Sequence, residues 1–432
     1  MPTFFQSRRF TAIEALLALL ILSTVYLTGI EKVSFGQDES HWIHTSSYLE
    51  ILFTQRPDSP FWGEHYWTLT QPPVTRYLIG LGRLAGGYQP EDLNTPWQFD
   101  QDYATNVADG NLPESGLLWW SRLPMAVLAA LTGWVIFLLL RAAAGRLAGY
   151  YFLLVFLGNA YFLTHLRRAM SETPLLFFII LAAAACWKAL LELNKAYQQE
   201  VVTTKKMQKP GGWFLAAGVC CGLAGASKIN GLFSIGGLFA LVVLSILLLA
   251  GRAERGLRRT FAIRSAILSV FAALLVFIVI NPYLYANPLV NTARMFKFRV
   301  QEMSLQVAGF PENVLSDSPL ERLDVISRRI FEDYAWPNFR GARWLNLSLT
   351  AVGLGSLLWR AWHWLRSGEN DPSAIALLVL PAPLAGAALV TPLDWDRYYL
   401  FPVVLAACCG AAGLGAIGMR LGRAVTTKKR PN

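Results

Sequence analysis

Two adjacent carboxylates, Asp38 and Glu39, directly follow the first long apolar run of the chain, and His41 and His44 lie within six residues of them. A carboxylate can act as a general base when it lies within hydrogen-bond reach of the proton that it removes. Ionisable side chains at membrane helices are costly and usually serve function. We therefore expect this stretch to act on a polar or charged substrate, with Asp38 as the base and Glu39 and His41 as neighbours that tune or orient it.

The same residues have structural interpretations that the sequence leaves open. Asp38 and Glu39 suit the N-cap and first turn of a helix over 38–55, a role that is compatible with catalysis. His41 and His44 could share a metal ion with Asp38, but no third ligand set is evident. We expect no metal at this site, with a divalent cation as the alternative.

The composition indicates a membrane protein. Of the 432 residues, 54% are hydrophobic and only 15% are charged, whereas soluble domains carry about 25% charged residues. All five cysteines fall inside apolar runs, which predicts buried thiols and no disulfide framework. The net charge of +10 is better explained by anchoring at the cytoplasmic side than by nucleic-acid binding.

Apolar runs near 20 residues, the length that crosses a hydrocarbon core, recur along the chain. Ten spans are predicted, at 11–30, 117–140, 147–164, 173–193, 212–228, 231–251, 263–281, 344–361, 373–391 and 398–419. The first reads as a retained signal anchor. With both termini in the cytoplasm, every inside segment is rich in Lys and Arg. The division between 212–228 and 231–251 is the least secure.

Two long loops are predicted on the outer face, over 31–116 and 282–343. The first should hold two helices in the membrane interface, one over 38–55 and one that starts at Pro72-Pro73 and carries Arg76. Its acidic segment over 87–116 reads as a solvated loop, with a calcium site as the alternative. The second loop is basic, and those cations either pair with nearby acids or meet a negative group.

Other ionisable residues gather on the face that holds Asp38. They are Arg167, Arg168 and Glu172, then Lys228, then Asp394, Asp396 and Arg397. Such a patch suits a lipid-phosphate sugar as substrate. The phosphate would be held by Lys228, Arg168 and Arg397, while Asp38 deprotonates an acceptor hydroxyl. Arg167 and Arg168 could instead extend their side chains to the membrane interface, with no role in binding. Asp394-Trp-Asp396 matches a metal-binding Asp-x-Asp pattern, although pairing with Arg397 or capping of the last helix explains it better.

Several of these stretches resemble membrane glycosyltransferases of the GT-C class, in the branch of protein O-mannosyltransferases and the lipid A aminoarabinose transferase. The matching stretches are Phe35-Gly-Gln-Asp38-Glu39, Gln71-Pro72-Pro73-Val-Thr-Arg76-Tyr77, Leu166-Arg-Arg168-Ala-Met-Ser-Glu172, Gly222-Leu-Ala-Gly-Ala-Ser-Lys228-Ile-Asn230-Gly231 and Asp396-Arg397-Tyr398-Tyr399-Leu-Phe-Pro402. Glu172 stands where that branch has Asp, and no large added outer domain is evident.

The resemblance implies an all-α polytopic fold and inverting transfer of a sugar from a polyprenyl-phosphate donor to an acceptor hydroxyl of a lipid, glycan or protein on the outer face of the plasma membrane. It implies that Asp38 is the base. The further residues expected at the substrate are His41, Arg76, Glu172, Asn230 and Tyr398. We expect one transmembrane domain over 1–425 and a basic cytoplasmic tail over 426–432. A transporter of a lipid or anionic solute is the main rival, but the charges cluster at one interface rather than at mid-membrane.

Overall fold

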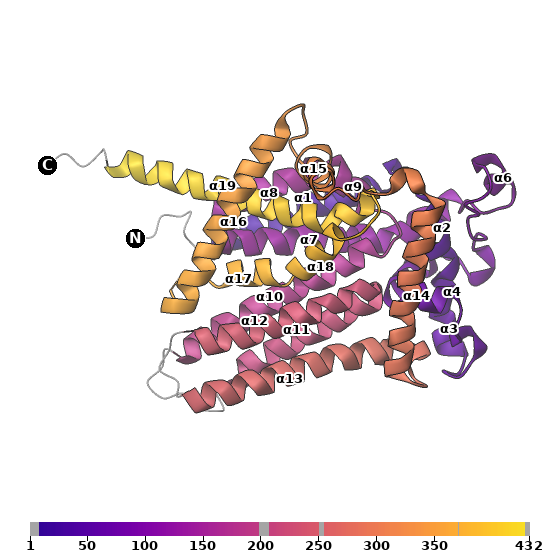
Figure 1. Ribbon diagram of the computed structural model, residues 1–432, viewed down its shortest axis with the longest axis horizontal. Coiled ribbons are helices and arrows are strands. Elements are labelled where there is room, and N and C mark those ends of the chain that lie inside the picture. Colours follow the sequence, from indigo (N-terminus) through magenta and orange to yellow (C-terminus); the bar gives the residue numbers. More distant parts are fainter. Residues whose placement is uncertain (1–7, 198–206, 250–254, 370, 428–432) are drawn as a thin grey trace.

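The computed structural model describes residues 8–197, 207–249, 255–369 and 371–427, and within these ranges it is helical with no strand. The long helices form a bundle that has both termini at one end, the left in Figure 1. The predicted all-α fold is therefore confirmed. The bundle helices are α1 (Arg8–Thr28), α7 (Ser115–Ala144), α8 (Arg146–Gly158), α10 (Glu172–Tyr197), α11 (Gln208–Ser227), α12 (Phe233–Leu248), α13 (Arg255–Ile280), α16 (Ala342–Ser367), α17 (Ser373–Val379), α18 (Ala382–Leu389) and α19 (Leu400–Thr427).

Each of the ten predicted spans overlaps described helical residues, and residues 250 and 251 of the span over 231–251 lie outside the described residues. Six described segments are long and apolar enough to cross a membrane: Thr11–Thr28, Ser115–Ala144, Glu172–Tyr197, Ile229–Leu248, Arg255–Ile280 and Asp396–Leu421. The chain is thus a multi-pass membrane protein. Helices α11 and α12 are separated by Lys228 and a 3-10 turn at Ile229–Leu232, so the two runs there are two helices. Most of the expected cytoplasmic tail, 428–432, lies outside the described residues.

Two predicted spans are interrupted. Residues 147–164 divide into α8 and α9 (Ala160–His165), because the Asn159 side chain accepts a hydrogen bond from the Tyr161 amide and starts a new helix. Residues 373–391 divide into α17 and α18 at Leu380-Pro381, since proline cannot continue the hydrogen bonding of a helix. Neither break shows in the hydrophobic pattern.

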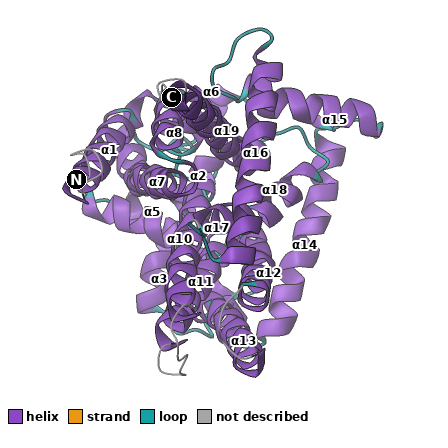
Figure 2. Ribbon diagram, turned by 90° about the vertical axis from the view of Figure 1, so that its left-hand side faces the viewer, coloured by secondary structure: helices purple, strands orange, loops and turns teal. Residues whose placement is uncertain are grey.

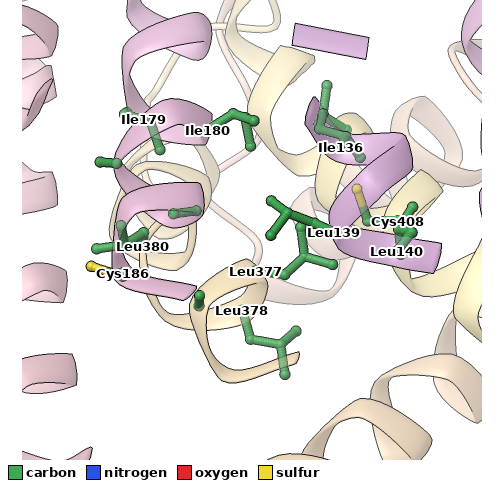
Figure 3. Packing of buried hydrophobic residues seen from close by; sticks show 14 of the residues in the cluster. Ile136, Leu139, Leu140, Ile179, Ile180, Cys186, Leu377, Leu378, Leu380 and Cys408 are labelled. Carbon is green, nitrogen blue, oxygen red and sulfur yellow. The ribbon is translucent and has the colours of Figure 1, made fainter. Parts of the chain in front are cut away.

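The buried core is built mainly from Leu, Ile, Ala and Phe on facing helices. Figure 3 shows Ile136, Leu139 and Leu140 of α7 near Leu377 of α17, with Ile179 and Ile180 of α10 close by. Small residues let the backbones of α16 and α19 approach closely. A Cβ at Gly353 would overlap the Cys409 carbonyl, so this crossing requires glycine.

Most of the connecting helices lie at the other end of the bundle, the right in Figure 1. The first loop holds α2 (Gln37–His44), α3 (Tyr48–Thr54), α4 (Tyr66–Thr70), α5 (Pro73–Ala85) and α6 (Tyr103–Ala108), and the second holds α14 (Pro288–Gly309) and α15 (Pro319–Arg328). The helix predicted over 38–55 is broken by a 3-10 turn at Thr45–Ser47. Helix α14 runs across the ends of the bundle helices and packs on α4 (Figure 1).

Candidate active site

A cavity of about 170 Å³ lies where α2, the turn between α9 and α10, and the start of α19 meet. Its lining includes two carboxylates, two guanidinium groups and one imidazole. These are Asp38, Asp396, Arg168, Arg397 and His165, and the walls are completed by Gly36, Gln37, Phe99, Met170 and Trp395. Three residues that were predicted from separate parts of the sequence, Asp38, Arg168 and Arg397, therefore line one cavity.

Asp38 forms an ion pair with Arg397, and the two residues lie 359 positions apart in the chain. The Asp38 side chain keeps 40% of its surface exposed, so one edge of the carboxylate remains open to the cavity. The Arg397 guanidinium lies 4.9 Å from the ring centre of Trp395 and 5.6 Å from that of Tyr398. Two aromatic rings thus fix the cation that faces the candidate base.

Glu39 is fully buried and points away from that cavity into an ion pair with Arg122 of α7. Its carboxylate accepts hydrogen bonds from Arg122 Nε at 2.7 Å and Nη2 at 2.6 Å, from the Ala169 amide at 2.8 Å and from the Gly36 amide at 2.9 Å. Glu39 therefore joins α2, α7 and the turn that carries Arg168. This placement supports a positioning role, not contact with substrate.

The two neighbouring arginines of the turn before α10 have different roles. Arg167 is buried and donates to the Tyr26 carbonyl at 3.2 Å and the Val25 carbonyl at 2.5 Å, so it caps the end of α1. Burial lowers the pKa of Arg167. Arg168 instead lines the cavity and donates to Ser34 Oγ at 3.3 Å, and its buried Nε has no acceptor among the described residues.

Glu172 and Lys228 form a second ion pair beside the first, with a distance of 2.6 Å between Oε1 and Nζ. Glu172 begins α10 and also attracts Arg397 electrostatically. Lys228 ends α11, and its side chain is 23% exposed. Asn230 follows in the turn before α12, and its Oδ1 is buried without a donor among the described residues.

His165 is the ionisable cavity residue that the sequence analysis missed. Its Nε2 lies 3.3 Å from Asp396 Oδ2, and the Tyr161 hydroxyl donates to the Asp396 carbonyl at 2.7 Å. Asp394 faces another way, because Arg329 binds both of its oxygens at 2.7 to 3.2 Å. The Asp394-Trp-Asp396 motif therefore does not present two free carboxylates to one metal ion.

The acidic segment over 87–116 forms one wall of the cavity. Phe99 lines it and stacks on His41, with ring centres 5.4 Å apart. His41 Nε2 lies 2.9 Å from the Trp97 carbonyl, and burial lowers the pKa of the imidazole. Two acids of the segment over 87–116 cap helices: Asp102 accepts a hydrogen bond from the Thr105 amide at the start of α6, and Glu114 is the N-cap of α7.

Both histidines proposed as alternative metal ligands are held by backbone carbonyls, His41 by Trp97 and His44 by Asn94. Within the described ranges, no group of three or more His, Cys, Asp or Glu side chains is arranged to hold a metal ion. Whether transfer needs a metal stays a prediction.

Arg76 does not reach the cavity. It is buried in the first loop, where its guanidinium lies 4.2 Å from the Tyr48 ring centre and donates to the carbonyls of Trp67 and Gln71. Burial lowers the pKa of Arg76 to about 10. Arg76 therefore joins α5 to α3 and α4, which is a structural role.

Tyr398 connects the cavity to the second loop. Its hydroxyl accepts a hydrogen bond from Arg299 Nη2 at 3.0 Å, and Arg299 Nη1 lies 2.6 Å from Glu302. Glu302 also accepts from the Tyr66 hydroxyl at 2.9 Å. Arg299 of α14 is thus paired with Glu302, and the contact of Glu302 with Tyr66 ties the second loop to the first.

The helical fold and the charged cavity at one end of the bundle define a polytopic membrane protein with a site for a polar or anionic group. A family model of dolichyl-phosphate-mannose-protein mannosyltransferase matches residues 46–292, which is more than half of the chain. The chain belongs to this family, and the resemblance seen in its motifs is confirmed. The matched range contains Arg168, Glu172 and Lys228 but not Asp38 or Arg397, so the roles of the last two rest on geometry.

Two solved structures are similar over nearly the whole chain. The oligosaccharyltransferase of Archaeoglobus fulgidus in the apo form has 14% identity and a TM-score of 0.52, covering 97% of this chain and 52% of its own. ArnT from Cupriavidus metallidurans bound to undecaprenyl phosphate has 15% identity and a TM-score of 0.51, covering 97% of this chain and 64% of its own. This chain thus spans about half to two thirds of their length, and the likeness shows a shared fold. No curated protein sequence matches it.

Proposed function

We propose that this protein is an inverting glycosyltransferase that moves a sugar from a polyprenyl-phosphate donor to an acceptor hydroxyl. The observation that carries the proposal is the cavity in which Asp38 faces Arg168 and Arg397. Family membership supports sugar transfer. The structural neighbour ArnT binds undecaprenyl phosphate, which supports a donor of the same lipid class.

Asp38 acts as the general base. It takes the proton of the acceptor hydroxyl, whose oxygen then forms a bond to the anomeric carbon of the sugar. The bond between that carbon and the phosphate oxygen breaks, and the electron pair leaves with the polyprenyl phosphate. A phosphate is already a good leaving group, so no general acid is needed, and one displacement inverts the anomeric centre.

Arg168 makes the first contact with the donor phosphate. Two of the three predicted phosphate-binding cations are already paired with acids, Arg397 with Asp38 and Lys228 with Glu172. Arg168 forms no ion pair within 4 Å among the described residues, although Asp396 attracts it electrostatically, and its Nε lacks an acceptor. A bound phosphate then competes with Asp38 for Arg397. This exchange would hold the leaving group at two guanidinium groups and free the base when donor is present.

The elements that line the cavity, α2 and the segments after α9 and before α19, lie at the end of the bundle opposite the start of α1 and the end of α19 (Figure 1). Basic residues gather at the terminal end, for example Arg141 and Arg146, and such residues favour the cytoplasmic side. We therefore place transfer on the outer face of the plasma membrane. The acceptor is a hydroxyl of a lipid, glycan or protein that reaches this face.

The test measures sugar release from a panel of polyprenyl-phosphate sugars by the purified protein in nanodiscs, with cell-envelope acceptors present. The proposal expects the parent to consume one donor class and a folded Asp38→Asn variant to be inactive. Glu31→Gln is a matched control, because Glu31 is an exposed acid seven positions earlier. Consumption of no donor by the parent, or normal turnover by Asp38→Asn, would refute this assignment.

A further inference from the structure

A second cavity, of about 780 Å³, lies on the flank of the bundle between α1, α7, α10 and α11. Viewed from the end that holds the termini, these four helices occupy one side of the molecule (Figure 2). The volume falls within the roughly 300–1,000 Å³ that ligand pockets occupy. Its lining is mostly apolar, with Leu138, Leu139, Leu181 and several alanines.

This flank cavity is far from the candidate active site. Lys188 lines it and lies sixteen residues along α10 from Glu172, which corresponds to about 24 Å of helix at 1.5 Å per residue. A hydrocarbon core is about 30 Å thick. Lys188 therefore lies near the opposite membrane interface, at the depth of phospholipid headgroups in that leaflet.

The polar lining of the flank cavity is positive and incompletely paired. Arg141 is neutralised by Glu14 at 2.6 Å. Lys188 is exposed, its Nζ lies 4.7 Å from the Trp187 ring centre, and no described carboxylate lies within ion-pair distance. The Trp187 Nε1 is buried and has no acceptor among the described residues. The Lys188 ammonium group thus lacks an anionic partner at one mouth of the cavity.

Two further tryptophans, Trp134 and Trp213, line the same cavity. Tryptophan and lysine gather at membrane interfaces, where an apolar ring or stem meets a polar headgroup. An apolar chamber with an unpaired cation at its mouth fits a molecule with an acyl chain and a phosphate. A neutral headgroup would leave the excess positive charge without a counter-charge.

We propose that the flank cavity between α1, α7, α10 and α11 binds an anionic glycerophospholipid of the membrane, with its headgroup at Lys188 and an acyl chain in the apolar chamber. This site is separate from the cavity that holds Asp38. It stands on its own residues and does not depend on the transferase assignment.

Native mass spectrometry can test the site on full-length protein released from nanodiscs that hold equal amounts of phosphatidylglycerol and phosphatidylcholine with the same acyl chains. We expect the parent to retain phosphatidylglycerol over phosphatidylcholine by about tenfold, as one charge-assisted contact provides. Lys188→Gln should lose this preference and Lys188→Arg should keep it. Ala184→Phe, which fills the chamber, should retain less of both lipids.

Arg264→Gln is the matched control, because Arg264 is exposed near the same end of the bundle on α13 and does not line the cavity. It should keep the parent's preference. Equal retention of the two lipids by the parent would overturn the proposal, and so would an equal loss of preference in Lys188→Gln and Arg264→Gln. Sugar transfer is measured separately, so failure of the lipid site does not affect the transferase test.

Discussion

Replacing Arg122 by Met should be among the most destabilising single changes near the candidate site. Arg122 is 2% exposed, and its guanidinium donates to both oxygens of Glu39 and to the carbonyls of Ile30, Val33 and Ser34. The variant leaves the Glu39 carboxylate buried without its counter-charge. Breaking a buried ion pair in this way costs about 3–5 kcal/mol.

The assay is denaturant unfolding of the purified protein in detergent, followed by near-ultraviolet circular dichroism. A double variant, Arg122→Met with Glu39→Leu, should be less destabilised than Arg122→Met alone, because removal of both partners leaves no uncompensated charge. Arg56→Met is the control, since Arg56 is exposed in the same loop region and pairs only with exposed Asp58 at 3.4 Å. A loss of under about 1 kcal/mol for Arg122→Met, the typical range of surface pairs, would refute the reasoning.

Arg168→Gln should raise KM for the donor about tenfold by removing a charge-assisted phosphate contact. Arg167→Gln should instead lower the unfolding midpoint and leave KM near the parent's. A raised KM in Arg167→Gln with an unchanged KM in Arg168→Gln would contradict the assignment of this turn. Burial lowers the pKa of His41, so the unfolded chain binds more protons than the folded one between that lowered pKa and the unfolded value of about 6.5. The His41 contribution to stability should therefore be complete above about pH 6.5 and fall as pH decreases toward the folded pKa. The measurement is the free energy of unfolding as a function of pH, and a His41→Gln variant with the same pH dependence as the parent in this window would refute the prediction. Gly353→Ala should destabilise the α16–α19 crossing, while Gly355→Ala, where an added Cβ meets nothing within 4 Å, should be neutral or stabilising by up to about 1 kcal/mol; equal thermal shifts in the two variants would show that the crossing is not tight.

The sequence predicted helices well because the length and apolar character of each run are local properties. It also predicted that Asp38, Arg168 and Arg397 share one face, since topology follows from counting spans and basic loops. The breaks at Asn159 and at Leu380-Pro381 were missed, because the spans were assigned from length and hydropathy alone, although a proline inside an apolar run itself favours a helix break.

Side-chain direction was much harder to predict. Glu39 adjoins Asp38 but faces Arg122, which lies 83 positions away, and only the packed fold brings these partners together. Arg76 lies on the predicted helix, yet packing turns it onto Tyr48 and away from the cavity. His165 could have been noticed three positions before Arg168, whereas nothing in the acidic segment indicates that Phe99 forms a cavity wall.

The central claim is that Asp38 removes the acceptor proton and does not serve to bind the donor. The most direct test measures donor affinity and transfer rate for Asp38→Asn in the same nanodiscs. The account predicts donor binding at least as tight as the parent's, because Arg397 is released for the phosphate, together with a transfer rate reduced by about 10²–10⁴-fold, the usual contribution of a general base. A transfer rate within a few-fold of the parent's, in a variant that binds donor normally, would contradict the claim.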